Sequence, residues 1–174
     1  MEGERHWPSF PRRLEVVSMK MRRQDRAIPD GEALAILTKA EIGYLSLAVA
    51  NTPYVVPLNF VVMDNFIYFH CATTGRKLDM LDQNAKCCFV VSSLDGIKAG
   101  ENACDFGAFF TSVIVEGTAR RVTDENEKVL SLNKLTEKHN PAGHTFQLVT
   151  PERAKAVVVI AISIDSISGK ARKA

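Results

Sequence analysis

Apolar and polar residues alternate along much of the chain, a period of two that is typical of β-strands with one buried face. The clearest example runs from Tyr54 to Val62, where every even position is apolar and belongs to one continuous face. Five further segments have strand character: 42–50, 66–71, 85–92, 109–122 and 156–167. The last is apolar on both faces over much of its length, as expected for a strand buried between a barrel interior and a partner.

Three segments favour helices instead. Asp30 is a suitable N-cap for a helix that ends near Ala40, and residues 75–84 form a second, short helix. Residues 124–140 give the clearest helix, because acidic residues occupy its first turn and basic residues its last. Six strands and three helices, joined mostly by short turns, predict a mainly β fold: a closed or nearly closed antiparallel barrel with peripheral helices.

Two segments fall outside these elements. Residues 93–107 are polar and contain glycine, and such a loop is long enough to suspect a function. Residues 1–20 carry prolines and many charges without a sustained period, so we expect an irregular N-terminal arm there. Because no repeat, low-complexity tract or linker divides the rest, residues 21–174 are expected to form a single domain.

Composition and charge narrow the class of protein. Hydrophobic residues make up 46% of the 174 residues and charged residues 24%, which is usual for a soluble globular protein. The net charge of +2 gives no support to a nucleic-acid binder. No stretch approaches the roughly 20 apolar residues that span a bilayer, and charged residues interrupt the N-terminus where a secretion signal would be apolar. We therefore expect a cytoplasmic protein without a membrane partner.

The four cysteines do not follow a metal-binding pattern. They are Cys71, Cys87, Cys88 and Cys104, and none forms a C-x-x-C pair. Cys87 and Cys88 are adjacent in a predicted strand, so their side chains point to opposite faces and cannot chelate one ion together. We expect reduced thiols and no metal site.

The segment that carries most chemical information runs from Thr73 to Lys77. It leaves a predicted strand, passes two hydroxyl residues and Gly75, and enters a helix with Arg76 and Lys77 in its first turn. Cations are unfavourable at a helix N-terminus, which carries partial positive charge. A bound phosphate would remove the conflict, held by free backbone N–H groups, hydroxyls, a guanidinium and an ammonium. Alternatively, Arg76 and Lys77 are solvated and pair with Asp79 or Asp82 of the same helix.

Several runs together resemble the nitroimidazole-resistance (Nim) family, which belongs to the pyridoxamine 5′-phosphate oxidase-like FMN-binding split barrels. They are Tyr54-Val-Val-Pro-Leu-Asn-Phe60, Ile67-Tyr-Phe-His70, Gly75-Arg-Lys-Leu-Asp79, and Ser112-Val-Ile114 with Gly117. The resemblance covers residues 20–170 in the same order and spacing. It implies a six-stranded antiparallel split β-barrel and a homodimer with two FMN molecules at the subunit interface.

The resemblance also implies which residues contact the cofactor. These positions are Pro57, Leu58, Asn59, Phe69, His70, Thr74, Arg76, Lys77, Ser112 and Val113. Arg76 and Lys77 match the positions that grip the FMN phosphate. Ser112 and Val113 match a strand position that reaches the flavin of the other subunit. Pro57 lacks an N–H group, which independently places its strand at an edge or a bulge of the sheet.

Some of these positions also have simpler interpretations. Asn59 can be a solvent-facing side chain, and His70 either a polar surface residue or a catalytic residue beside the flavin. Cys104, in the long loop, either lines the cleft or is an incidental thiol. Phe110 and Thr111 stand where family members commonly have Tyr-Arg. The chain ends at Ala174 without the C-terminal Trp- and Arg-containing segment of the true pyridoxamine-phosphate oxidases, so that oxidase activity is not expected.

The function that these observations favour is an FMN-dependent oxidoreductase. It would pass electrons from a nicotinamide donor to a small acceptor such as a nitroaromatic compound, and the cofactor would supply the chemistry. No G-x-G-x-x-G motif is present, so NAD(P)H would bind only transiently. The alternative is a non-enzymatic carrier or sensor that holds flavin or haem, with His70 as an axial ligand.

Overall fold

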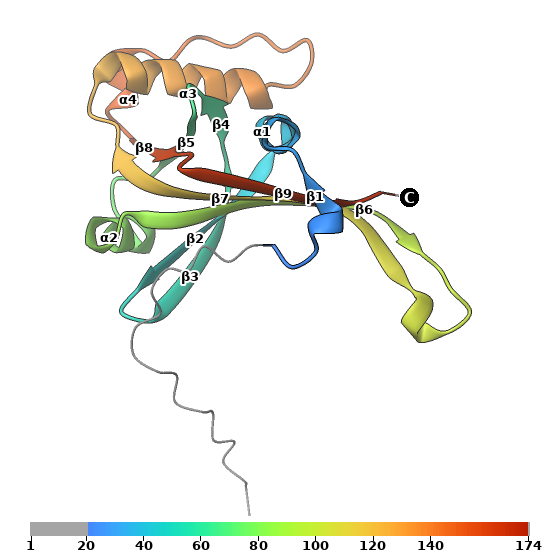
Figure 1. The fold of residues 1–174 in the computed structure, drawn as a ribbon. Helices are drawn as coiled ribbons and strands as arrows, with labels where there is room; N and C mark the ends of the chain where they lie inside the picture. Colours follow the sequence, from blue (N-terminus) through green and yellow to red (C-terminus); the bar gives the residue numbers. More distant parts are fainter. Residues whose placement is uncertain (1–20, 174) are drawn as a thin grey trace, which may run out of the picture.

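The structure is a computed structural model that describes residues 21–173, so the predicted N-terminal arm over residues 1–20 lies outside it. The strands are β1 (Ala27–Ile28), β2 (Ile42–Val49), β3 (Thr52–Asn59), β4 (Val61–Met63), β5 (Phe66–Cys71), β6 (Lys86–Lys98), β7 (Gly107–Arg121), β8 (Val158–Ser163) and β9 (Ser166–Arg172). The helices are α1 (Asp30–Lys39), α2 (Arg76–Gln83), α3 (Glu125–His139) and α4 (Pro151–Ala154), with short 3-10 turns at Gln24–Arg26 and Ala103–Asp105. All strand pairs are antiparallel, and the helices lie around the sheet (Figure 1). The predicted mainly β fold is confirmed.

Strand β7 organises the sheet. It pairs with β6 along its length on one side, and on the other side first with β9 and then, from Ala119 onward, with β8. The change of partner falls at Gly117, where an added Cβ would lie 2.0 Å from the carbonyl oxygen of Ser163. Only a glycine allows the two backbones to approach so closely. The sheet therefore continues in two directions from β7, to β6, β2 and β3 and to β8, β5 and β4.

The predicted edge at Pro57 is confirmed, because β3 is the terminal strand on its side of the sheet. In the described sheet, no strand pairs with β3 on the side away from β2, so no neighbour there requires an N–H group from Pro57. The alternation predicted for this segment also holds as far as Leu58. The predicted strand 54–62 is nevertheless interrupted: β3 ends at Asn59, and β4 begins at Val61. Phe60 and Val61 are both buried, and they belong to two different apolar clusters.

These two clusters lie on opposite sides of β5 and β8. Phe69 and Ile160 belong to the barrel interior, whereas Tyr68 and Val159 pack beneath α3 and α4. The predicted strand 156–167 is in fact two strands, β8 and β9, separated by Ile164 and Asp165. The second apolar face of this segment is thus covered by α3 and α4 of the same chain, and the expectation that a partner buries it is wrong. 

A polar network explains the break between β8 and β9. The Asp165 carboxylate accepts hydrogen bonds from the hydroxyls of Ser163 and Thr118, at 2.6 and 3.0 Å. The backbone N–H of Asp165 donates to the carbonyl oxygen of Glu116. These bonds hold the chain where it leaves β8, so that β9 can pair with an earlier part of β7.

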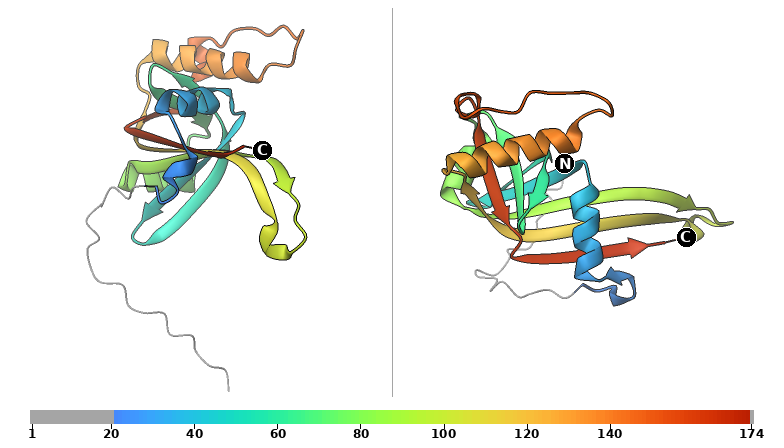
Figure 2. Two further views of the ribbon diagram at one scale, coloured as in Figure 1. Left: turned by 45° about the vertical axis from the view of Figure 1, so that its right-hand side comes forward. Right: turned by 90° about the horizontal axis from the view of Figure 1, so that it is seen from above.

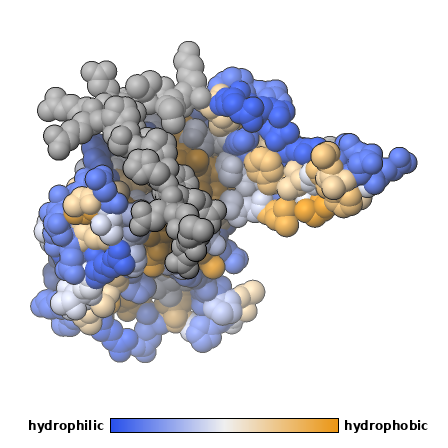
Figure 3. Space-filling view, turned by 90° about the horizontal axis from the view of Figure 1, so that it is seen from below, coloured by the Kyte–Doolittle hydropathy of each residue, from blue (hydrophilic) through white to orange (hydrophobic). Residues whose placement is uncertain are grey.

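Residues 93–107 are not the long loop that the sequence predicts. Strand β6 continues to Lys98, and the β6–β7 hairpin projects from the body of the molecule (Figure 2). A bulge separates Leu94 from Gly96, and the Asp95 carboxylate accepts bonds from the hydroxyls of Ser93 and Thr111. The hairpin carries exposed apolar surface (Figure 3), and Cys104 lies exposed at its tip.

Within residues 21–173, no helix is long and apolar enough to cross a membrane. The same residues contain no cluster of three or more His, Cys, Asp or Glu side chains that could hold a metal ion. The four cysteines are free thiols, and burial raises the pKa of Cys87 to about 12, which keeps it protonated.

The close approach at Gly117 makes a prediction about stability. We expect Gly117→Ala to lower the free energy of unfolding by about 1–3 kcal/mol, as overpacking of a rigid site does. Gly31→Ala on α1 is the matched control, because an added Cβ there meets nothing within 4 Å. Urea denaturation measures both variants, and equal stabilities would contradict the role given to Gly117.

Candidate functional site

The start of α2 lacks the partners that normally complete a helix N-terminus. No side chain caps it, and Gly75 precedes it with a φ of 133°, a conformation that favours glycine. The N–H groups of Leu78 and Asp79 donate to the Gly75 carbonyl oxygen, at 2.8 and 3.2 Å. The N–H groups of Arg76 and Lys77 have no backbone partner within the described part of the chain. Two donors therefore remain available at this end of the helix.

Two aromatic rings hold the cations of this helix start. The Arg76 guanidinium lies 4.6 Å from the centroid of the Tyr54 ring, and the Lys77 ammonium lies 5.3 Å from that of Phe69. Neither cation forms an ion pair with a residue between 21 and 173. The alternative of pairing within α2 is thus not what the structure shows, and Asp82 instead binds Arg121, at 2.7 Å.

A small cavity of about 170 Å³ opens at this helix start. It is lined by Tyr54, Cys71, Ala72, Thr74, Gly75, Arg76, Lys77 and Leu78. Hydroxyl, ammonium and guanidinium donors meet here with free backbone N–H groups, and an added Cβ on Gly75 would find open space. This is the donor set of a phosphate site at a helix N-terminus.

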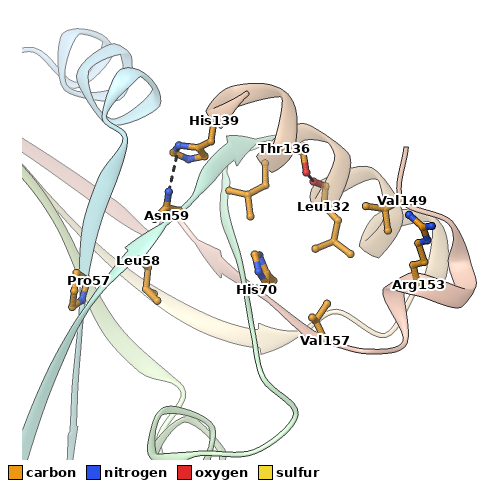
Figure 4. A pocket seen from close by; sticks show the side chains of 11 residues that line it. Pro57, Leu58, Asn59, His70, Leu132, Thr136, His139, Val149, Arg153 and Val157 are labelled. Carbon is orange, nitrogen blue, oxygen red and sulfur yellow. Dashed lines mark hydrogen bonds between the residues drawn. The ribbon is translucent and has the colours of Figure 1, made fainter. Parts of the chain in front are cut away.

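A larger cavity of about 620 Å³ lies beneath α3 (Figure 4). It is lined by Pro57, Leu58, Asn59, His70, Leu132, Leu135, Thr136, His139, Val149, Arg153 and Val157. Most of its wall is apolar, with a few polar groups, which is typical of a pocket for a small molecule. Strands β3 and β5 contribute residues to both cavities.

His70 faces the large cavity from β5. Partial burial lowers the pKa of its imidazole, and the charge of Lys77 lowers it further. Since an ordinary histidine has a pKa near 6.5, the ring is neutral at pH 7. A neutral imidazole can accept a hydrogen bond, take up a proton or coordinate a metal ion. The structure thus gives His70 a position and a charge state suited to catalysis or ligation.

A chain of hydrogen bonds fixes Asn59 at the other side of the cavity. Its Nδ2 lies 3.5 Å from Nδ1 of His139, whose Nε2 lies 3.4 Å from the carbonyl oxygen of Phe60. A carbonyl oxygen can only accept, so Nε2 carries the proton and Nδ1 accepts the bond from Asn59. The Asn59 side chain is exposed, as its simpler interpretation expected, and it is also anchored at the cavity.

The remaining predicted residues line neither cavity. Phe69 and Val113 are buried in the barrel interior, where Phe69 supports Lys77 from below. Ser112 lies on the opposite face of β7, and its hydroxyl approaches the Lys170 carbonyl oxygen at 3.5 Å. The resemblance assigns Ser112 and Val113 to the flavin of a second subunit, so that assignment stays a prediction.

Sequence reasoning missed the residues that α3 and α4 bring to the large cavity. Among them are His139 and Arg153, which complete its basic lining. One signal was available: Leu132, Leu135 and His139 are three and four residues apart, so they share one face of α3. His139 was instead interpreted only as a favourable cation at the end of a helix.

Solved structures from other organisms share this fold. A flavocytochrome, Anf3 from Azotobacter vinelandii, is 26% identical over 88% of this chain and 72% of its own, with a TM-score of 0.77. A candidate 5-nitroimidazole antibiotic resistance protein from Bacteroides thetaiotaomicron is 23% identical over 83% and 85%, with a TM-score of 0.70. An FAD- and haem-binding protein from Mycobacterium smegmatis is 22% identical over 80% and 69%, with a TM-score of 0.71.

No curated protein sequence matches the chain significantly. Its sequence does match the pyridoxamine 5′-phosphate oxidase family over residues 29–171, which include both cavities and nearly the whole sheet. The chain therefore belongs to the pyridoxamine 5′-phosphate oxidase family.

Proposed function

We propose that the protein binds FMN and acts as a flavin-dependent oxidoreductase. The observation that carries this proposal is the start of α2, where Arg76 and Lys77 form no ion pair with any residue of the described chain and stand beside free N–H groups. Each cation costs about 0.3–1 kcal/mol at a helix N-terminus. A phosphate at the same place turns both repulsions into charge-assisted hydrogen bonds.

The residues that line the two cavities fit both parts of FMN, its phosphate and its ring system. Thr74, Arg76 and Lys77 suit its terminal phosphate, and the large cavity suits a planar, mostly apolar ring beside Asn59 and His70. The likeness to a flavocytochrome and to an FAD- and haem-binding protein supports a flavin. A small cavity for one phosphate group favours the mononucleotide.

The bound flavin would accept electrons from a nicotinamide and release them to a small acceptor. The residues of this chain bind and orient it, and neutral His70 can hold or move a proton beside the ring. A nitroaromatic acceptor is supported by the likeness to the candidate nitroimidazole resistance protein. The four free cysteines support a cytoplasmic location, where thiols stay reduced.

We further propose a homodimer with flavin at the subunit interface. A row of side chains on the outer face of the sheet crosses Pro57, Tyr44, Val90 and Ile114 on four adjacent strands. Tyr44 and Ile114 are 44% and 43% exposed, which leaves apolar surface on this face and supports its use as an interface. Ser112 belongs to the same face, so pairing through it brings Ser112 to a second subunit.

A haem carrier or sensor is the second candidate function. The observation that favours it is the apolar cavity into which the imidazole of His70 faces, with a second imidazole, that of His139, at the other side. Imidazole is a common axial ligand of haem iron, and two of the structural relatives are haem proteins by name.

An absorption spectrum separates the two functions. We expect the purified protein, incubated with FMN and desalted, to be yellow and to lose its flavin absorbance when NADPH or NADH is added without oxygen. A variant with His70→Ala should keep the flavin but bleach more slowly, since the phosphate site is intact. A Soret band, or bound flavin that neither nicotinamide reduces, would favour the carrier or sensor.

Mixed dimers test the shared site. A Ser112→Trp chain and an Arg76→Ala/Lys77→Ala chain are each expected to form homodimers that retain no FMN. In a mixed dimer, one site combines Arg76 and Lys77 of the Ser112→Trp chain with Ser112 of the Arg76→Ala/Lys77→Ala chain and is therefore intact. The second site contains all the substitutions.

We therefore expect about one FMN per mixed dimer, against two per wild-type dimer. Differently tagged chains, purified over both tags, provide mixed dimers of known composition. Mixed dimers that retain no flavin would contradict a site built from both subunits.

A further inference from the structure

The ionisable side chains that line the large cavity are all basic. Its titratable lining residues are His70, His139 and Arg153, and no carboxylate joins them in the lining. Arg153 supplies a guanidinium, whose planar group of N–H donors matches a carboxylate. The wall between the basic groups is apolar, with Leu132, Val149 and Val157 (Figure 4).

The backbone of Arg153 is held by its own short helix, and its side chain is exposed at the edge of the cavity. The Thr150 hydroxyl accepts a bond from the Arg153 N–H, and the following residue, Ala154, is buried beneath α3. The guanidinium forms no ion pair with any residue of the described chain. Figure 4 places it at the end of the cavity away from Asn59 and His139. A cation without a counter-charge thus borders a mostly apolar chamber.

We propose that this cavity binds an apolar molecule that carries a carboxylate, with the carboxylate on Arg153 and the apolar body along α3. A guanidinium can hold a carboxylate through two parallel hydrogen bonds, and the apolar wall offers a surface on which the apolar body of the ligand can pack. The ligand is distinct from the flavin, whose phosphate belongs to the small cavity and whose ring is proposed to lie beside Asn59 and His70, away from Arg153 (Figure 4). Free apolar acids and the propionates of haem share this chemistry.

Paired ligands that differ only in the carboxylate test the proposal. Octanoate and 1-octanol are titrated into the full chain by calorimetry, and haemin and its dimethyl ester by absorbance. The variants are Arg153→Gln and, as matched control, Lys155→Gln, which removes an exposed cation two residues away that does not line the cavity.

We expect the wild type and Lys155→Gln to bind at least one of the acids about tenfold more tightly than its neutral analogue. The preference should vanish in Arg153→Gln. If octanoate binds more tightly than 1-octanol, the ligand of the site is a free apolar acid. If only haemin binds more tightly than its ester, the ligand is a haem propionate.

Three results would overturn the proposal: neither acid is preferred by the wild type, Arg153→Gln keeps the preference, or octanoate displaces bound FMN mole for mole. Flavin content is measured in the same samples. A chain that prefers the acid but never holds flavin would contradict the proposed flavin function and leave the carboxylate site standing.

Discussion

The exchange of strand partners at Gly117 is the constraint on which the rest of the structure depends. Because its backbone passes so close to the Ser163 carbonyl, β7 can pair with β9 along one half and with β8 along the other. Strand β8 then carries β5, and β5 carries His70 and leads into α2. Both cavities therefore owe their positions to one residue without a side chain, far from either of them in the sequence.

Helices α2 and α3 differ in how their N-terminal ends are completed. Helix α3 is complete: the Asp124 side chain caps it by accepting a bond from the Glu127 N–H at 2.7 Å, and its terminal charges match its dipole. Helix α2 has no cap, two cations at the wrong end and aromatic rings that hold those cations in place. The start of α2 therefore leaves donors and positive charge that an anion would complement.

The sequence was informative wherever a local pattern decides the structure. The alternation in β3, the helix boundaries and the anomaly at Arg76 and Lys77 are all local, and all are found in the structure. The break at Asp165 was not visible, because it depends on hydroxyls from Thr118 and Ser163 on two different strands. The extended hairpin could not be predicted for the same reason. Asp95 is typical of a loop by itself, and its place in the strand depends on the hydrogen bond from the Thr111 hydroxyl on β7.

The large cavity could be predicted only in part. Pro57, Asn59 and His70 were identified through the family resemblance, and they do lie together. Arg153 and His139 reach the same place through packing of α3 and α4 against the outer side of β5, a contact between segments distant in sequence. Periodicity shows which residues share a face of α3, but it does not show which face of the sheet that helix covers.

A comparison of FMN with riboflavin tests the proposal that the start of α2 binds the phosphate of a flavin. Quenching of flavin fluorescence gives the affinity of each for the wild type and for Arg76→Ala/Lys77→Ala, with Lys39→Ala on α1 as control. Two charge-assisted hydrogen bonds at about 1.5–3 kcal/mol each predict that FMN binds the wild type about a hundredfold or more tightly than riboflavin does. We expect this ratio to fall close to one in the double variant alone; equal affinities for FMN and riboflavin in the wild type would contradict a phosphate site at α2.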